Sequence, residues 1–129
     1  MALEVDIADY IAMETSLVVD TDLFIGDEPH DSPDACVTVV GSPGLDTESG
    51  MEIRSFQILA KDNAYVDALD LAVDVHNLFK NKPGFPHTIE DVFFCEVIGS
   101  PYPIDRDARG RYIFTSNYII RQRGEAESS

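Results

Sequence analysis

Residues 63–80, NAYVDALDLAVDVHNLFK, carry the most regular pattern in the chain, and the rest of the predicted architecture is arranged around them. Apolar side chains recur there at helical spacing and aspartates take the other positions, which predicts an amphipathic helix of about 17 residues. Asp62 or Asn63 would cap it and Pro83-Gly84 would stop it. Such a helix is about 25 Å long, enough to cross a small sheet. The expected buried stripe consists of Val66, Leu69, Ala72 or Val73, His76 and Phe79.

Strand patterns lie on both sides of this helix. Residues 52–61 alternate with period two, which predicts a strand. Residues 92–98 form a nearly continuous apolar run, typical of a central strand, and residues 111–121 alternate again. The connection 99–110 contains two prolines and four charged residues. It is long for a hairpin loop, and long loops are often binding loops.

The N-terminal half predicts one more helix and two more strands. Residues 3–13 have the pattern of a short amphipathic helix. Its apolar face is formed by Leu3, Ile7, Tyr10 and Ile11. Residues 23–25 and 35–40 predict strands, whereas residues 17–19 fit an extension of either the helix or the strand. Residues 41–51, with four glycine or proline positions, predict an exposed hairpin loop.

The predicted order is therefore helix, three strands, helix, two strands. Short connections make the first three strands antiparallel, and the last two as well. Two helices stacked on one face would bury the sheet. We predict a two-layer α+β fold with a mainly antiparallel sheet of about four to five strands. Residues 1–123 would form a single domain and residues 124–129 a flexible tail.

Charge is distributed unevenly along the 129 residues. The net charge is −15, from 24 acidic and nine basic side chains. Residues 1–50 contain twelve acids and no Lys or Arg, whereas residues 106–123 contain five arginines and one aspartate. A protein this acidic should repel duplex DNA, which carries about one negative charge per 1.7 Å. The asymmetry fits either solubility alone or an acidic face of one copy that meets the arginine-bearing face of the next.

Cellular location and redox state follow from simple sequence features. No apolar run approaches the ~20 residues of a membrane helix, and the N-terminus lacks a basic stretch followed by an apolar one. We expect a protein made and kept in the cytoplasm, with no membrane partner. Cys36 and Cys95 both lie inside apolar runs, which predicts reduced, buried thiols rather than a disulfide scaffold.

Candidate nucleophiles and bases do not converge on one site. A catalytic serine or cysteine needs a histidine and an acid beside it. His30 and His87 lie in predicted loops, and His76 lies on the apolar stripe of the long helix, as a packed core histidine does. No Gly-x-Ser-x-Gly, His-Glu-x-x-His or phosphate-cradling glycine loop occurs. We expect no catalytic residues, no cofactor and no enzymatic activity.

The acidic segment 20–34 is the best candidate for a metal site. A calcium loop needs acids at positions 1, 3 and 5 and a glycine at position 6. Asp20 and Asp22 supply the first two, but Phe24 and Ile25 stand where the third acid and the glycine are required. A second candidate is the acidic pair Asp105 and Asp107 in the 99–110 loop. It could bind a divalent ion, but so could many acidic loops. We expect a solvated acidic loop and no metal.

Residues 101–118, PYPIDRDARGRYIFTSNY, combine a charged loop, a Gly-Arg pair and an aromatic strand that contains Asn-Tyr. In this order they resemble the tail-terminator and minor capsid (head–tail joining) proteins of long-tailed bacteriophages. The helix before them and the overall length also fit. The resemblance covers residues 50–121, and the acidic first 50 residues match only in the order of helix and strands.

The resemblance implies a structural virion protein at the head–tail interface, made in the host bacterial cytoplasm. It would form a six-fold ring that caps the tail tube protein and joins it to the head–tail connector or stopper protein. DNA would pass through the ring without specific binding, repelled by the acidic lumen. Separated charges suit a heterologous interface, which closes into a ring when the rotation allows. The expected intersubunit or connector contacts are Arg106, Arg109 and Arg111, with Asp27, Glu28 and Asp31 as acceptors.

Other interpretations stay open at the level of sequence. The six charged residues could instead lie in solvated loops and contact no partner. A head-completion or connector subunit is the nearest alternative function. An acidic module that mimics DNA and occupies a basic nucleic-acid site would stay monomeric or dimeric. A divalent-metal hydrolase would require tight ion binding.

Overall fold

The computed structural model describes residues 3–41, 45–46, 51–79, 92–97 and 99–123. In chain order the elements are α1 (Leu3–Glu14), β1 (Leu23–Ile25), β2 (Cys36–Gly41), β3 (Leu45–Asp46), β4 (Met51–Asp62), α2 (Tyr65–His76), β5 (Val92–Val97), β6 (Tyr102–Ile104) and β7 (Tyr112–Arg123). The tail at residues 124–129 lies outside the described residues.

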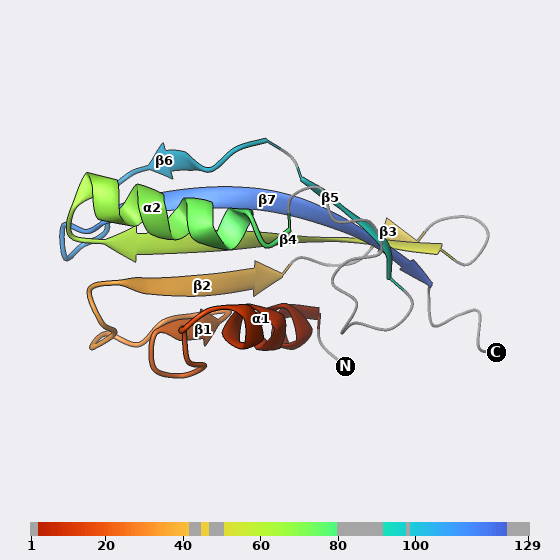
Figure 1. Ribbon diagram of the computed structural model, residues 1–129, viewed down its shortest axis with the longest axis horizontal. Coiled ribbons are helices and arrows are strands. Elements are labelled where there is room, and N and C mark those ends of the chain that lie inside the picture. The colour runs from red at the N-terminus through yellow and green to blue at the C-terminus, as the bar shows by residue number, and fades with distance from the viewer. Residues whose placement is uncertain (1–2, 42–44, 47–50, 80–91, 98, 124–129) are drawn as a thin grey trace.

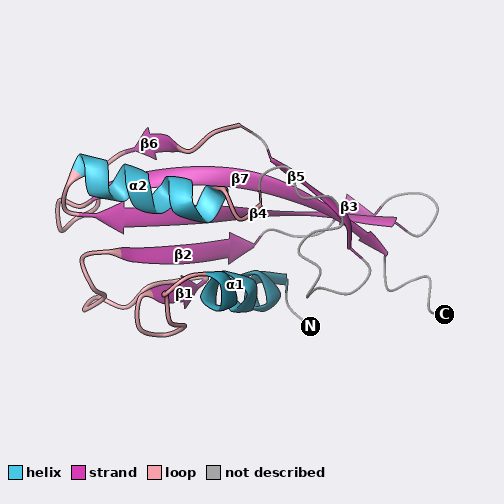
Figure 2. Ribbon diagram, viewed as in Figure 1, coloured by secondary structure: helices cyan, strands magenta, loops and turns pink. Residues whose placement is uncertain are grey.

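All the strands belong to one sheet, and both helices cover one of its faces (Figure 1). The main path through the sheet is β1-β2-β4-β7-β5, with β3 beside β4 and β6 beside β7. Figure 2 shows the two helices lying along the strands rather than across them. The predicted two-layer α+β fold is therefore confirmed, and the sheet is mixed, with mostly antiparallel pairs.

The first pair of strands corrects one prediction. β1 and β2 are parallel, with Leu23 opposite Val37 and Ile25 opposite Val39, so the expectation of three antiparallel strands is wrong for this pair. The connection over residues 26–35 explains the direction, because at up to about 3.3 Å per residue it is far longer than a three-residue strand. The chain returns to the starting end of β1 before β2 begins. The pairs β2–β4, β4–β7 and β5–β7 are antiparallel.

Two segments predicted as loops contribute short strands. β3 lies within residues 41–51 and pairs with β4, and β6 lies within residues 99–110 and pairs with β7. β7 has twelve residues, and β5 pairs only with its second half. The edge of the first half is left for β6, which lies opposite Ile113 to Thr115.

Helix α2 is shorter than its sequence pattern predicts. Its N-cap residue is Ala64, which makes no side-chain capping bond, and the helix ends at His76. Asp62 does not cap it, because this residue ends β4 and its carboxylate accepts a bond from the N–H of Asn63. A tighter turn carries the chain on to Phe79, whose N–H donates to the His76 carbonyl. The expected stop at Pro83-Gly84 lies outside the described residues.

The buried face of α2 is also rotated from the predicted stripe. Val66 is 62% exposed, whereas Ala68, Ala72 and Val75 are buried together with His76. Small side chains at these positions let the helix backbone approach the sheet closely. Phe79 is buried as predicted. On α1, Ile7, Tyr10 and Ile11 are buried as predicted, Ala8 is buried as well, and the Leu3 side chain lies outside the description.

Aromatic rings join the two helices to the sheet. The Phe79 ring lies 5.8 Å from that of Tyr10 on α1 and 5.6 Å from that of Phe56 on β4. Phe56 stacks on Tyr118 of β7 at 4.9 Å. The Tyr118 hydroxyl is 2.8 Å from Nδ1 of His76, which is buried, so the interpretation of His76 as a packed core residue is confirmed.

Candidate functional site

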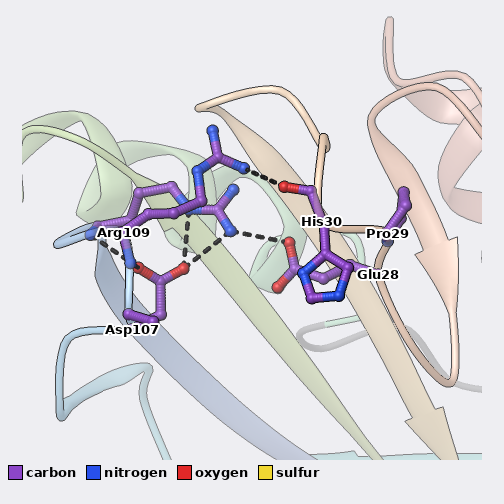
Figure 3. A pocket seen from close by; sticks show the side chains of 7 residues that line it. Glu28, Pro29, His30, Asp107 and Arg109 are labelled. Carbon is purple, nitrogen blue, oxygen red and sulfur yellow. Dashed lines mark hydrogen bonds and ion pairs between the residues drawn. The ribbon is translucent and has the colours of Figure 1, made fainter.

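Two loops that are distant in sequence meet at one end of the sheet. The loop over residues 26–35 joins β1 to β2, and the loop over residues 105–111 joins β6 to β7. Their charged side chains surround the last part of β4 (Figure 3). The largely buried group of Glu28, Lys61, Asp107 and Arg111 is called the charge cluster below.

Asp107 organises its own loop. Its Oδ1 accepts hydrogen bonds from the backbone N–H groups of Arg109 and Arg111, at 3.0 and 2.9 Å. Gly110 makes the turn possible, because its φ of +80° is a conformation that residues with a Cβ rarely adopt. The chain therefore turns back over Asp107, whose Oδ2 accepts a further bond from Nε of Arg111 at 2.8 Å.

Arg111 connects the two loops. Its side chain is only 3% exposed, and its Nη2 donates to Glu28 at 2.9 Å. Its Nη1 donates to the Pro33 carbonyl at 2.9 Å and lies 3.2 Å from the Ser32 hydroxyl. The guanidinium thus has a carboxylate on each side and backbone contacts with the opposite loop. A buried charge needs this degree of pairing to be tolerated.

Lys61 completes the charge cluster from β4. Its ammonium forms an ion pair with Glu28 and lies 3.7 Å from the Asp107 carboxylate. The four side chains carry two negative and two positive charges, so the cluster is neutral. Register explains how Lys61 arrives there, because it lies between Cys36 of β2 and Ile113 of β7 in the sheet.

The cluster shifts the acid–base properties of its members. Burial acts to raise the pKa of Asp107, but hydrogen bonds from Arg111 and the charges of Arg111 and Lys61 outweigh it and hold that pKa below 3.8. Burial lowers the pKa of Lys61, and the like charge of Arg111 lowers it further against the attraction of Asp107. Asp107 is therefore a carboxylate at neutral pH, as the bonds it accepts require.

Arg109 closes the outer side of the contact. Its Nη1 donates to the Ser32 carbonyl at 2.7 Å and its Nη2 to Asp34 at 3.0 Å. In Figure 3, Asp107 and Arg109 face Glu28 and His30 across a hollow of about 190 Å³. The Arg109 and Asp34 side chains are about half exposed, so their ion pair contributes less to stability than the ion pair of Arg111 with Glu28.

The six charged residues predicted as intersubunit or connector contacts occupy different environments. Three of them form contacts within one chain: Arg109 and Arg111 donate hydrogen bonds to the β1–β2 loop, and Glu28 of that loop accepts the one from Arg111. Arg106 lies apart from the cluster and is exposed. Asp27 and Asp31 are exposed in the β1–β2 loop and form no ion pair with another described residue. A role in contacts between proteins stays a prediction for all six.

Sequence patterns did not reveal the full cluster. In the sequence, Asp107 is a candidate only as one of the acidic pair in the 99–110 loop, and no pattern marks Lys61 or Ser32. One local signal was present, because Asp107 precedes a glycine and an arginine by three and four positions, the spacing that lets a carboxylate hold a turn. No local signal links Lys61 to Glu28, which is 33 positions away.

The chemistry of the cluster is that of a structural clamp. Cys36 lies beside it, with Sγ 3.5 Å from Nη1 of Arg111. Burial raises the pKa of its thiol by more than the Arg111 charge lowers it, so the thiol stays protonated, as expected for an inert core cysteine. Within the described part of the chain, no three His, Cys, Asp or Glu side chains are placed to hold a metal ion. The Cys95 side chain lies outside the description.

We predict that Asp107→Asn makes the protein less stable at neutral pH and less sensitive to acid. A carboxylate with a lowered folded pKa contributes stability that is present above its unfolded pKa, near 3.9, and is lost as the pH falls through the folded value. The free energy of unfolding should therefore fall less steeply below pH 4 in the variant than in the wild type. Urea titrations followed by circular dichroism between pH 2 and 7 would measure both slopes.

Asp105→Asn is the matched control, since Asp105 is exposed in the same loop and forms no ion pair with a described residue. Its acid slope should equal that of the wild type. Equal slopes for Asp107→Asn and the wild type would contradict the stabilising role of this carboxylate.

Fold and site together define a small α+β protein, in which a charge clamp fixes two loops to the end of a sheet that is covered by helices on one face. Across the described residues, no helix is long and apolar enough to cross a membrane. The family model of the bacteriophage tail terminator protein matches residues 10–123. The chain therefore belongs to the bacteriophage tail terminator family, and it is a structural tail protein.

A solved structure shows the same fold. The chain is similar to a chain of the "Virion of native gene transfer agent (GTA) particle", with a TM-score of 0.61 and 13% sequence identity. The match covers 95% of this chain and 96% of that chain, so the two domains correspond over nearly their whole lengths. No curated protein matches the sequence. The resemblance noted at residues 101–118 is confirmed by the family match.

Proposed function

We propose that this chain forms a closed ring of six copies that caps the tail tube and joins it to the connector or stopper protein of the head. The observation that carries the proposal is the tail terminator family match over residues 10–123. DNA would pass through the ring without specific binding. The net charge of −15 per copy supports this part, because an acidic wall repels the phosphate backbone.

The charge clamp supports a role in assembly. A ring needs subunits whose surfaces keep one shape, since a heterologous contact closes only at a fixed rotation. Arg109 and Arg111 hold the β6–β7 loop against the β1–β2 loop, so this end of the subunit is a rigid surface before any partner binds. Rigid surfaces lose less conformational entropy on association.

The proposal is tested by mass measurement and imaging. Light scattering on the purified 14.3 kDa chain across concentrations, alone and with polymerised tail tube protein from the same virion, should reveal a species of six copies. Negative-stain images should show rings, and in the mixture they should lie at the ends of tubes. Binding to purified connector without binding to tubes would instead support a head-completion subunit. A monomer that binds neither protein would overturn the proposal.

A further inference from the structure

The two side edges of the sheet carry exposed apolar side chains. One edge is β1 with α1 beside it, and the opposite edge of this half of the sheet is β6, as Figure 1 shows at the bottom and the top. The first edge exposes Met13 (58%) and Val18 (55%). The opposite side exposes Tyr65, Val66, Tyr102 and Ile104, each by 43% or more. In a head-to-tail interface each copy contributes two different surfaces, so both must be exposed in the single chain.

Arg106 is held in position on the β6 side. Its guanidinium carbon lies 4.2 Å from the centre of the Tyr112 ring, and its Nε donates to the Gly110 carbonyl at 2.9 Å. The Tyr65 ring packs edge-on against Tyr112 at 5.6 Å, which fixes the aromatic support. The two terminal nitrogens of Arg106 donate to no other described residue. Arg109 and Arg111, by contrast, use their terminal nitrogens within the chain.

A guanidinium held in this way is prepared to bind a carboxylate. Its terminal nitrogens match the two oxygens of a carboxylate, and their orientation is fixed before binding, so less entropy is lost. Tyrosine and arginine are also the residues enriched at the centres of protein interfaces. The β6 side therefore has the composition and the geometry of a docking surface for an acidic partner segment.

The α1–β1 edge of the same chain has the complementary chemistry. Asp9, Glu14 and Asp20 are exposed there, and none forms an ion pair with a described residue. Glu14 and Met13 are both exposed in the last turn of α1, so this end of the helix presents a carboxylate as well as an apolar side chain to solvent. Exposed lysine or arginine is absent from the described part of this edge, residues 3–25, since residues 1–50 contain neither.

We propose that the β6 side of one copy docks on the α1–β1 edge of the next, with Arg106 bound to Glu14 and the exposed tyrosines packed against Met13 and Val18. This inference rests on the proposed ring and names the surfaces that build it. Side chains carry the contact, because Pro103 in β6 has no N–H to donate to an added strand. Of the three arginines predicted for intersubunit contacts, Arg106 is the one whose terminal nitrogens donate to no other residue in the described part of the chain.

Charge reversal tests the pairing. Arg106→Glu should weaken ring formation at least tenfold. Light scattering measures this on the chain alone or mixed with tail tubes. The double variant Arg106→Glu with Glu14→Arg should restore ring formation. Circular dichroism should show unchanged thermal unfolding, since both side chains are exposed. Asp74→Arg, a reversal at an exposed position near the other end of α2, is the control and should leave ring formation intact. Rings of unchanged affinity in Arg106→Glu, or no restoration in the double variant, would overturn the pairing.

Cross-linking tests the geometry separately. With a bis-maleimide about 10 Å long, a mixture of Met13→Cys and Tyr102→Cys chains should give dimers that contain one of each. The chain with both substitutions should give a ladder up to the closed ring, and the parent chain should give neither product. Homodimers of Met13→Cys alone would overturn the head-to-tail arrangement. A wild type that forms no ring in any condition would count against the proposed function. Rings that form but give no cross-link between positions 13 and 102 would count against this interface only.

Discussion

Replacing Arg111 with alanine is expected to lower the free energy of unfolding by about 3–5 kcal/mol, the usual cost of removing one partner from a buried ion pair. The side chain is 3% exposed, and it donates to Asp107, Glu28 and a backbone carbonyl. Without it, the two largely buried carboxylates would retain Lys61 as their one positive partner among the described residues. Urea unfolding followed by circular dichroism measures the change.

Arg106→Ala is the control for Arg111→Ala, because Arg106 is an exposed arginine of the same loop. It should change the free energy of unfolding by no more than about 1 kcal/mol, the value of an exposed cation–π contact such as that of Arg106 with Tyr112. A loss below 1 kcal/mol for Arg111→Ala would contradict the clamp. A double-mutant cycle with Glu28→Ala adds a second check, because side chains in one charge network should show a coupling of about 0.5–3 kcal/mol.

The second large effect is expected at Phe79, where replacement by alanine should cost about 3–5 kcal/mol. The ring is fully buried and contacts Tyr10 of α1, Phe56 of β4 and Tyr118 of β7. It therefore joins both helices to the sheet, and its removal leaves a cavity that three different elements would have to close. The same urea titrations report the loss.

Val66→Ala provides the comparison for Phe79→Ala, since Val66 is the exposed apolar residue that the sequence pattern had placed in the core. Its substitution should lie within about 0.5 kcal/mol of the wild type. Equal losses at the two positions would contradict the observed rotation of α2. An intact ring in Val66→Ala would also show that this residue lies at the margin of the proposed interface.

Much of the fold could be predicted because its signals are local. Tyr10 and Ile11 on α1 were correctly placed by helical periodicity, and the alternation of residues 52–61 matches the buried positions of β4 from Phe56 to Ala60. The errors occurred where local signals compete. The apolar Val66 points to solvent while Ala68 is buried, because contact with the sheet favours small side chains on that face.

The candidate site could be predicted only in part. An excess of arginine near residue 109 and of acid before residue 50 predicts attraction between the acidic face of one copy and the arginine-bearing face of the next. The sequence could not distinguish attraction between copies from attraction within one chain. The structure pairs Arg111 with Glu28 and Arg109 with Asp34 inside the chain, whereas the terminal nitrogens of Arg106 have no partner among the described residues.

Periodicity, composition and the 101–118 motif were therefore sufficient for the α+β class, for most elements and for the family of the chain. Strand direction and charge pairing depended on tertiary structure. The parallel β1–β2 pair results from the path of a loop, and the Arg111–Glu28 pair joins residues 83 positions apart. Helical and strand patterns repeat over a few residues, so they can be seen in sequence, whereas such contacts exist only after the sheet has brought distant loops to the same end.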